Sequence, residues 1–181
     1  MVVVKGIVFN LLEHVAVDRY GEDAWDDILA RSKLVGAYTS LGSYPDDQFR
    51  RLIDAASAAL DLPADDVIRW FGRSAIPLLA ETYPALFTPH SQTLEFLLTL
   101  NDIIHPEVRK LYPGADVPEF QMDVGDDGSL TIGYGSRRKL CAFAEGLIQG
   151  AADHYTERVV IEQPRCMRRG DETCQIRVAF S

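Results

Sequence analysis

The chain has 181 residues, of which 47% are hydrophobic and 25% are charged, a composition that is usual for one globular domain. The excess of 27 acidic over 18 basic residues gives a net charge of -9 and argues against binding to nucleic acids or anionic membranes, which relies on clustered Lys and Arg. No apolar run approaches the roughly 20 residues that span a bilayer, and Met1–Lys5 lacks the layout of a signal peptide. We expect a single cytoplasmic domain over residues 1–181.

The first part of the chain predicts a series of helices. Apolar residues from Val4 to Val15 recur with helical spacing and predict a helix that ends near Gly21. Further helices are expected over residues 23–33, 46–60 and 64–82. Gly72 and Pro77 lie inside the last of these helices, and we expect a bend or a break there because proline removes a backbone hydrogen bond.

A histidine lies on the apolar face of the next predicted helix. His105 shares this face with Leu94, Leu97, Leu98, Ile104 and Val108. We therefore expect a dry environment for its imidazole. Pro106 follows directly and predicts a kink at the histidine.

The second half of the chain changes to the alternation that is typical of strands. Strands are expected over residues 120–124, 130–134, 158–161 and 174–180, and a helix over residues 140–151. The predicted fold class is α+β. It combines a helical part of about residues 1–62 with a part of about residues 63–181 that holds the His105 helix, a small antiparallel sheet of about four strands and one long helix.

Three polar side chains alternate on an extended segment. Tyr134, Ser136 and Arg138 present two hydroxyl donors and a guanidinium, a set that is suited to gripping carboxylates such as the propionates of haem. A histidine on an apolar helix face can bind haem iron axially. For each piece alone, a plainer interpretation is a core histidine or an exposed sheet edge.

These residues occur in one order together with Val4–Asn10, Ile104-His105, Pro118 and Glu145–Gly150. Over essentially its whole length, the chain resembles the H-NOX family, which is related to the sensor region of soluble guanylate cyclase. The resemblance implies a haem b buried between the two halves, with His105 as axial iron ligand and Tyr134, Ser136 and Arg138 on the propionates. It also implies that Pro118 presses on the porphyrin, and that the domain has no catalytic activity. Pro118 alone would be read as a strand start, and Pro106 departs from the family's pattern.

The resemblance also bears on which gas binds. In oxygen-binding members a distal tyrosine takes the place of Phe143, and its supporting Trp and Asn align with Leu12 and Ala75. Oxygen binding needs a hydrogen-bond donor near the bound ligand, whereas nitric oxide binds tightly without one. We expect an apolar distal pocket that selects nitric oxide, lined by Val8, Leu12, Ala75, Phe143 and Leu147. The alternative is that these side chains are merely core.

Three cysteines, Cys141, Cys166 and Cys174, form a second group. A structural zinc site needs four N or S ligands, and three-cysteine relatives supply a histidine at the position of Gln163. Either His154 or water would complete a zinc site here, or the group is a thiol redox switch. The plain interpretation is a set of isolated buried thiols.

The sequence as a whole predicts a nitric oxide sensor. By the resemblance, nitric oxide would bind the iron opposite His105, the bond from His105 to iron would break, and the two halves would shift. The signal would pass to a separate histidine kinase or cyclic-di-GMP enzyme. Two other classes remain: a haem-free domain of the 4-vinyl reductase type that binds a hydrophobic small molecule and has a cysteine metal site, and a haem peroxidase, which would require a distal acid–base residue.

Overall fold

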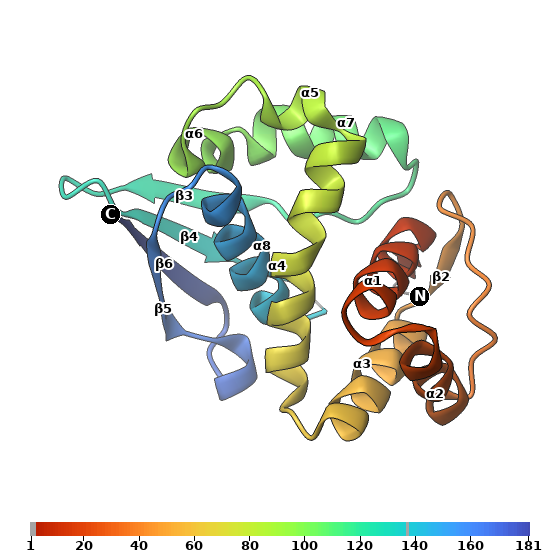
Figure 1. Cartoon of the computed structure of the whole chain (residues 1–181). Coiled ribbons are helices and arrows are strands. Elements are labelled where there is room, and N and C mark those ends of the chain that lie inside the picture. The colour runs from red at the N-terminus through yellow and green to blue at the C-terminus, as the bar shows by residue number, and fades with distance from the viewer. Residues whose placement is uncertain (1–2, 137) are drawn as a thin grey trace.

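A computed structural model of the chain describes residues 3–136 and 138–181 and confirms the α+β fold (Figure 1). The helices are α1 (Gly6–Tyr20), α2 (Glu22–Ser32), α3 (Asp46–Leu60), α4 (Ala64–Thr82), α5 (Pro84–Phe87), α6 (Thr93–Leu98), α7 (His105–Leu111) and α8 (Cys141–His154). The strands are β1 (Val3–Lys5), β2 (Ser43–Pro45), β3 (Phe120–Val124), β4 (Leu130–Tyr134), β5 (Val159–Arg165) and β6 (Cys174–Phe180). A π-helix at Leu100–Ile104 and a 3-10 helix at Met167–Arg169 complete the described elements.

The first helix begins later than its apolar spacing predicts. Val4 lies in β1, which pairs with β2 so that Val4 faces Tyr44, and α1 starts only at Gly6. A Cβ atom on Gly6 would lie 1.9 Å from the carbonyl oxygen of Thr39. The chain therefore turns from strand to helix at the one residue type that this contact allows.

Helix α4 runs through Gly72 and Pro77 without a break, so of the two predicted outcomes, a bend or a break, the break is wrong. Its close contact with α8 explains why the helix is held together. A Cβ atom on Gly146 of α8 would lie 2.1 Å from the carbonyl oxygen of Arg69, and one on Gly150 would lie 2.6 Å from that of Arg73. The glycines let the two backbones touch, and the Arg73 carbonyl, which Pro77 leaves without a helix donor, faces α8.

The hydrophobic core consists of two clusters that α4 joins. Figure 1 shows α1, α2 and α3 on one side of α4 and α8, with the sheet on the other. The first cluster surrounds Phe9 and Phe71, and the second surrounds Ile132 and Ile176, which face each other in the sheet of order β3-β4-β6-β5. Helix α4 gives Ala75 to the first cluster and Ile76 to the second. This arrangement places the long helices at the junction of the two halves.

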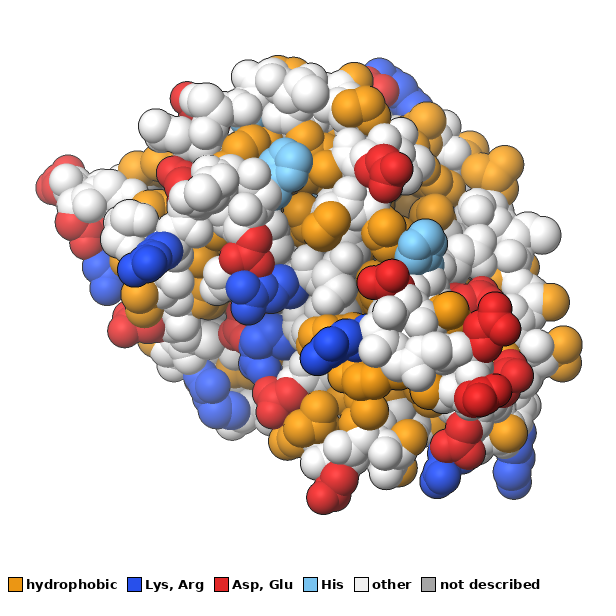
Figure 2. Space-filling view, viewed as in Figure 1, with side chains coloured by type: hydrophobic (Ala, Val, Ile, Leu, Met, Phe, Trp, Pro, Cys, Tyr) orange, Lys and Arg blue, Asp and Glu red, His pale blue; other side chains and the backbone are white. Residues whose placement is uncertain are grey.

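Charged residues on the surface follow the helix dipoles. Figure 2 shows acidic side chains gathered over α2, whose first turn carries Glu22 and Asp23. The pairs Asp46–Asp47 and Asp65–Asp66 open α3 and α4 in the same way, although Asp46 is buried. Acidic groups are favourable at helix N-termini, which accounts for these residues without a binding role. In the described part of the chain, no helix is long and apolar enough to cross a membrane.

Candidate functional site

The helical segment that carries His105 is irregular directly before the histidine. The Ile104 N–H donates to the Thr99 carbonyl at 3.0 Å, and the His105 N–H donates to the Leu100 carbonyl. These bonds span one residue more than those of an α-helix, which defines a π turn. The sequence predicts a kink at His105 because of Pro106. The structure places a widened turn on the N-terminal side of the histidine instead, and α7 then starts regularly.

An apolar cavity of about 330 Å³ lies between the two halves. Its walls include Ile7, Val8 and Leu11 from α1, and Phe143, Ala144 and Leu147 from α8. The sheet contributes Ile132, and the segment after the π turn contributes Val108. A volume of this size and an apolar lining are typical of small-molecule and cofactor sites.

The cavity brings together most of the predicted cofactor residues. It is lined by His105, Pro118, Tyr134, Ser136, Arg138, Val8, Phe143 and Leu147. Leu12 and Ala75, predicted for the distal wall, are buried in the first core cluster and are not among the lining residues. Leu12 lies one helical turn beyond Val8, and Ala75 is rotated by about 100° from its neighbour Ile76, which does line the cavity.

The environment of His105 favours a neutral imidazole. Burial, reinforced by the charge of Arg109, lowers the pKa of His105 to about 4, although the Pro118 carbonyl opposes the shift. The buried Nδ1 has no hydrogen-bond partner among the described residues. The ring packs against Phe120 with centroids 5.4 Å apart. Neutral imidazole is the form that binds metal ions, so this histidine is suited to an axial iron ligand.

Arg138 is a largely buried cation whose side chain is only 14% exposed. One guanidinium nitrogen, Nη2, donates to the Val3 carbonyl at 2.7 Å and to the Asp116 carboxylate at 3.1 Å. Nε lies 3.8 Å from the Asp46 carboxylate and is buried without a hydrogen bond among the described residues. A guanidinium has five N–H donors, so Arg138 retains donors for a carboxylate in the cavity.

Tyr134 and Ser136 also line the cavity. Burial raises the pKa of Tyr134, while a hydrogen bond with Ser136 works in the opposite direction. The phenol therefore stays protonated and can donate. The polar residues that line the mostly apolar cavity include His105, Tyr134, Ser136 and Arg138, and an imidazole, hydroxyls and a guanidinium are groups suited to a haem with its propionates.

Two further tyrosines, Tyr83 and Tyr112, line the cavity. Tyr83 follows α4 and Tyr112 follows α7, and their hydroxyl groups bond to each other. By contrast, the lining residues from α1 and α8 are apolar, and the Phe143 ring stacks on Phe71 with centroids 5.1 Å apart. Neither α1 nor α8 therefore presents a side-chain hydrogen-bond donor to the cavity among the described residues.

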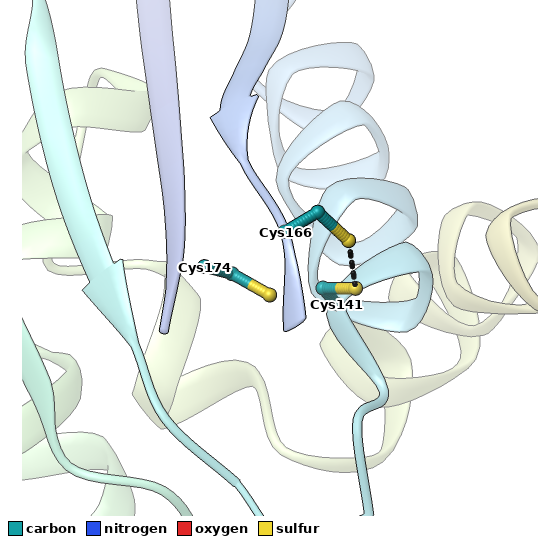
Figure 3. Close-up of side chains that lie close together, drawn as sticks. All are labelled: Cys141, Cys166 and Cys174. Atoms are coloured by element: carbon teal, nitrogen blue, oxygen red, sulfur yellow. Dashed lines mark hydrogen bonds between the residues drawn. The ribbon is translucent and has the colours of Figure 1, made fainter. Parts of the chain in front are cut away.

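The three cysteines form a buried cluster behind Tyr134. Their sulfur atoms lie within 4.8 Å of one another, and the Cys141 and Cys166 sulfurs are 3.6 Å apart (Figure 3). Burial raises the pKa of Cys174 to about 12. Burial also acts on Cys166, but hydrogen bonds from the Arg168 backbone and from Cys141 outweigh it and lower the pKa of that thiol. Cys166 is therefore the most readily ionised of the three.

The expected fourth zinc ligand is not His154. Cys141 begins α8 and His154 ends it, which separates them by about 20 Å at 1.5 Å per residue. The His154 ring instead packs on Phe87 with centroids 5.3 Å apart. Burial raises the pKa of the Cys141 thiol, and the nearby Gln163 only partly opposes this shift. The Gln163 amide nitrogen is buried without a hydrogen-bond partner in the described part of the chain. An amide is a poor zinc ligand, so within residues 3–136 and 138–181 the cluster has three sulfur ligands and lacks the fourth N or S donor of a structural zinc site.

Some residues around the cavity were not foreseen from the sequence. Asp46 and Asp116 contact Arg138, and Asn101 bonds to the backbone of Phe120. No spacing rule singles out the aspartates. Asn101 is a polar residue close to His105 in the sequence, but nothing in the spacing distinguishes it from its polar neighbours Thr99 and Asp102.

Comparisons with known proteins identify the family of the chain. A family model described as Haem-NO-binding matches residues 5–163. Soluble guanylate cyclase gcy-35 of Caenorhabditis elegans is 24% identical over 162 residues, which are 86% of this chain and 24% of that protein, so the chain spans about a quarter of that relative. The fold matches a crystal structure of an H-NOX protein from S. oneidensis in the Fe(II)NO ligation state, with a TM-score of 0.92 and 28% identity over 98% of this chain and 99% of that one. It also matches the Fe(II) unliganded H-NOX protein from K. algicida, with a TM-score of 0.88 and 28% identity over 98% and 97% of the two chains. The chain therefore belongs to the Haem-NO-binding (H-NOX) family of haem-based gas-sensor domains.

Proposed function

We propose that this domain binds haem b and senses nitric oxide without forming a stable complex with oxygen. The observation that carries the proposal is the apolar lining contributed by α1 and α8, with Phe143 stacked on Phe71. Distal donors and polarity decide which diatomic ligand a haem retains. A wall without hydrogen-bond donors does not stabilise bound oxygen, whereas nitric oxide binds tightly without such donors.

The remaining roles follow from the lining of the cavity. His105 would bind the haem iron, and the iron would supply the atom to which the gas binds. Tyr134, Ser136 and Arg138 would hold the propionates, and Pro118 would contact the porphyrin; all five residues line the cavity. For the distal wall we propose only Val8, Phe143 and Leu147, because Leu12 and Ala75 lie outside the lining.

We propose that the signal begins when His105 leaves the iron. The segment around α7 then becomes free to move against the sheet. The domain itself carries out no reaction in this scheme. A separate histidine kinase or cyclic-di-GMP enzyme would receive the movement.

Absorption spectra of the purified, reduced protein test this proposal. We expect a Soret band, a spectral change on adding nitric oxide, and no stable oxygen complex when the reduced protein meets air. A lasting oxygen complex would refute the selectivity argument. The absence of a Soret band would refute haem binding and favour the haem-free alternative. Turnover with peroxide would favour the peroxidase, which the apolar walls of α1 and α8 disfavour.

For the three cysteines we propose a thiol switch rather than a zinc site. The Cys166 thiolate would attack hydrogen peroxide to give a sulfenic acid and hydroxide, and the Cys141 thiol would then displace water and form a disulfide. The 3.6 Å separation of these sulfurs and the lowered pKa of Cys166 support this pair. Mass spectrometry after peroxide treatment should detect the disulfide in wild type and in Cys174→Ser but not in Cys141→Ser. Stoichiometric zinc in the purified protein would contradict the proposal.

A further inference from the structure

The side chain of Asn101 bridges the π turn to the edge of the sheet. Its Nδ2 donates to the Phe120 carbonyl at 2.7 Å, and its Oδ1 accepts from the Phe120 N–H at 3.0 Å. Phe120 is the first residue of β3, which is the edge strand of the sheet. The carboxamide thus satisfies both backbone groups of an edge residue, as a neighbouring strand would.

The π turn places this amide and the histidine on one short segment. Asn101 lies inside the turn, and His105 follows at its end, where its N–H closes the turn on the Leu100 carbonyl. Isolated π turns in helices occur frequently at functional sites. Here the turn allows one segment to contact β3 through Asn101 and to present His105 to the cavity.

The strand residue held by Asn101 contacts the predicted haem ligands. The Phe120 ring packs on His105 with centroids 5.4 Å apart and on Tyr134 with centroids 5.9 Å apart. Pro118, which also lines the cavity, lies two residues before Phe120. Fixing Phe120 therefore fixes the surface against which the imidazole rests.

The other end of α7 is tied separately. Tyr112 follows the helix and bonds to Tyr83. Loss of the Asn101 contacts would therefore release the end of the segment that carries His105, while the far end stays attached.

We propose that Asn101 is a positioning residue for the axial ligand. Its carboxamide holds the π turn against β3, fixes the orientation of the His105 ring toward the iron, and restrains the segment until His105 is released. The inference rests on the proposed haem binding. Beyond that function, we assign to Asn101 a role in setting how readily the bond from His105 to iron breaks.

Two variants of Asn101 remove its hydrogen bonds to Phe120 to different extents. Asn101→Leu has a similar size and loses both hydrogen bonds, whereas Asn101→Asp keeps the acceptor for the Phe120 N–H and loses the donor. Asp102→Leu is the matched control, because Asp102 lies in the same π turn, is exposed, and forms no side-chain hydrogen bond or ion pair within the described residues. If Asn101→Leu fails to fold, Asn101→Asp carries the test.

Two measurements on the full haem-loaded chain separate positioning from mere structural support. Hydrogen exchange of the Phe120 amide should accelerate about thirtyfold in Asn101→Leu, as expected for losing two ordinary hydrogen bonds. Resonance Raman spectra of the reduced protein without nitric oxide should show the iron–histidine stretch lowered and broadened in Asn101→Leu, intermediate in Asn101→Asp, and unchanged in Asp102→Leu. The release of His105 after nitric oxide addition should be faster in the same order.

Faster exchange at Phe120 with an unchanged iron–histidine stretch would overturn the inference, because Asn101 would then be only a structural link. An equal shift in Asp102→Leu would overturn it as well. A wild-type protein that binds no haem would overturn the proposed function and this inference together, so the two failures are distinguishable.

Discussion

The cavity has two helical walls that are built in opposite ways. Helix α8 lies backbone to backbone on α4 through Gly146 and Gly150, and ion pairs join the same helices from Arg69 to Glu145 at 2.8 Å and from Arg73 to Asp153 at 2.5 Å. The His105 segment consists instead of a π turn and the short helix α7. Among the described residues, its side-chain polar ties to other elements are those of Asn101 and Tyr112.

We infer that the two walls have different roles. Phe143 and Leu147 lie on the tightly held helix, so the apolar surface that we propose to meet the gas keeps its shape. His105 lies on the weakly held segment, so the proposed ligand can move when its bond breaks. A sensor needs both properties, because an element that responds to a ligand must be able to adopt two arrangements.

Gly146→Ala should have the largest effect, because it disrupts the packing of α8 on α4. The new Cβ atom would lie 2.1 Å from the Arg69 carbonyl oxygen, and neither backbone can yield cheaply, so the free energy of unfolding should fall by about 3 kcal/mol. Urea unfolding measures the change. Gly135→Ala is the control, because its Cβ would meet no atom within 4 Å, and it should leave stability within about 1 kcal/mol of wild type. Similar stabilities for both variants would mean that α8 is not rigidly packed.

Phe143→Tyr should change the ligand without loosening the wall. The added hydroxyl would enter an apolar part of the cavity and donate to bound oxygen, which at about 1.5 kcal/mol raises oxygen affinity roughly tenfold or more. Oxygen titration of the reduced protein measures the effect, and Phe143→Leu serves as the variant without a donor. If both variants fail equally to retain oxygen, the apolar wall is not what excludes it.

Tyr112→Phe should have the smallest effect and should loosen the wall that contains α7 without changing α8. It removes the hydrogen bond to Tyr83, which is worth about 1 kcal/mol. Hydrogen exchange should accelerate in α7 while α8 keeps its protection. Tyr20→Phe is the control, because Tyr20 is 41% exposed and its hydroxyl has no hydrogen bond in the described part of the chain. Equal acceleration in α7 and α8 would contradict the division into a fixed and a movable wall.

Features that depend on local pattern were predictable from the sequence. The strands β3, β4 and β6 follow the alternation of apolar residues, and α8 follows its helical stripe. His105, Tyr134, Ser136 and Arg138 could be placed at one cavity because their residue types and order are distinctive together.

Features that depend on distant partners were not predictable in this way. Val4 lies in a strand because β2 pairs with it, and α4 continues through Pro77 because α8 supports it. Leu12 and Ala75 have suitable residue types for the cavity wall, but small rotations along α1 and α4 place them in the core. His154 has a side chain suited to zinc, but the length of α8 separates it from Cys141 by about 20 Å.

The reduced spectrum of His105→Ala tests the central claim most directly. We expect that wild type shows a haem with one protein ligand, that His105→Ala loses this ligand, and that added imidazole restores the wild-type spectrum. A reduced spectrum of His105→Ala that is identical to wild type before imidazole is added would contradict the assignment of His105 as the iron ligand.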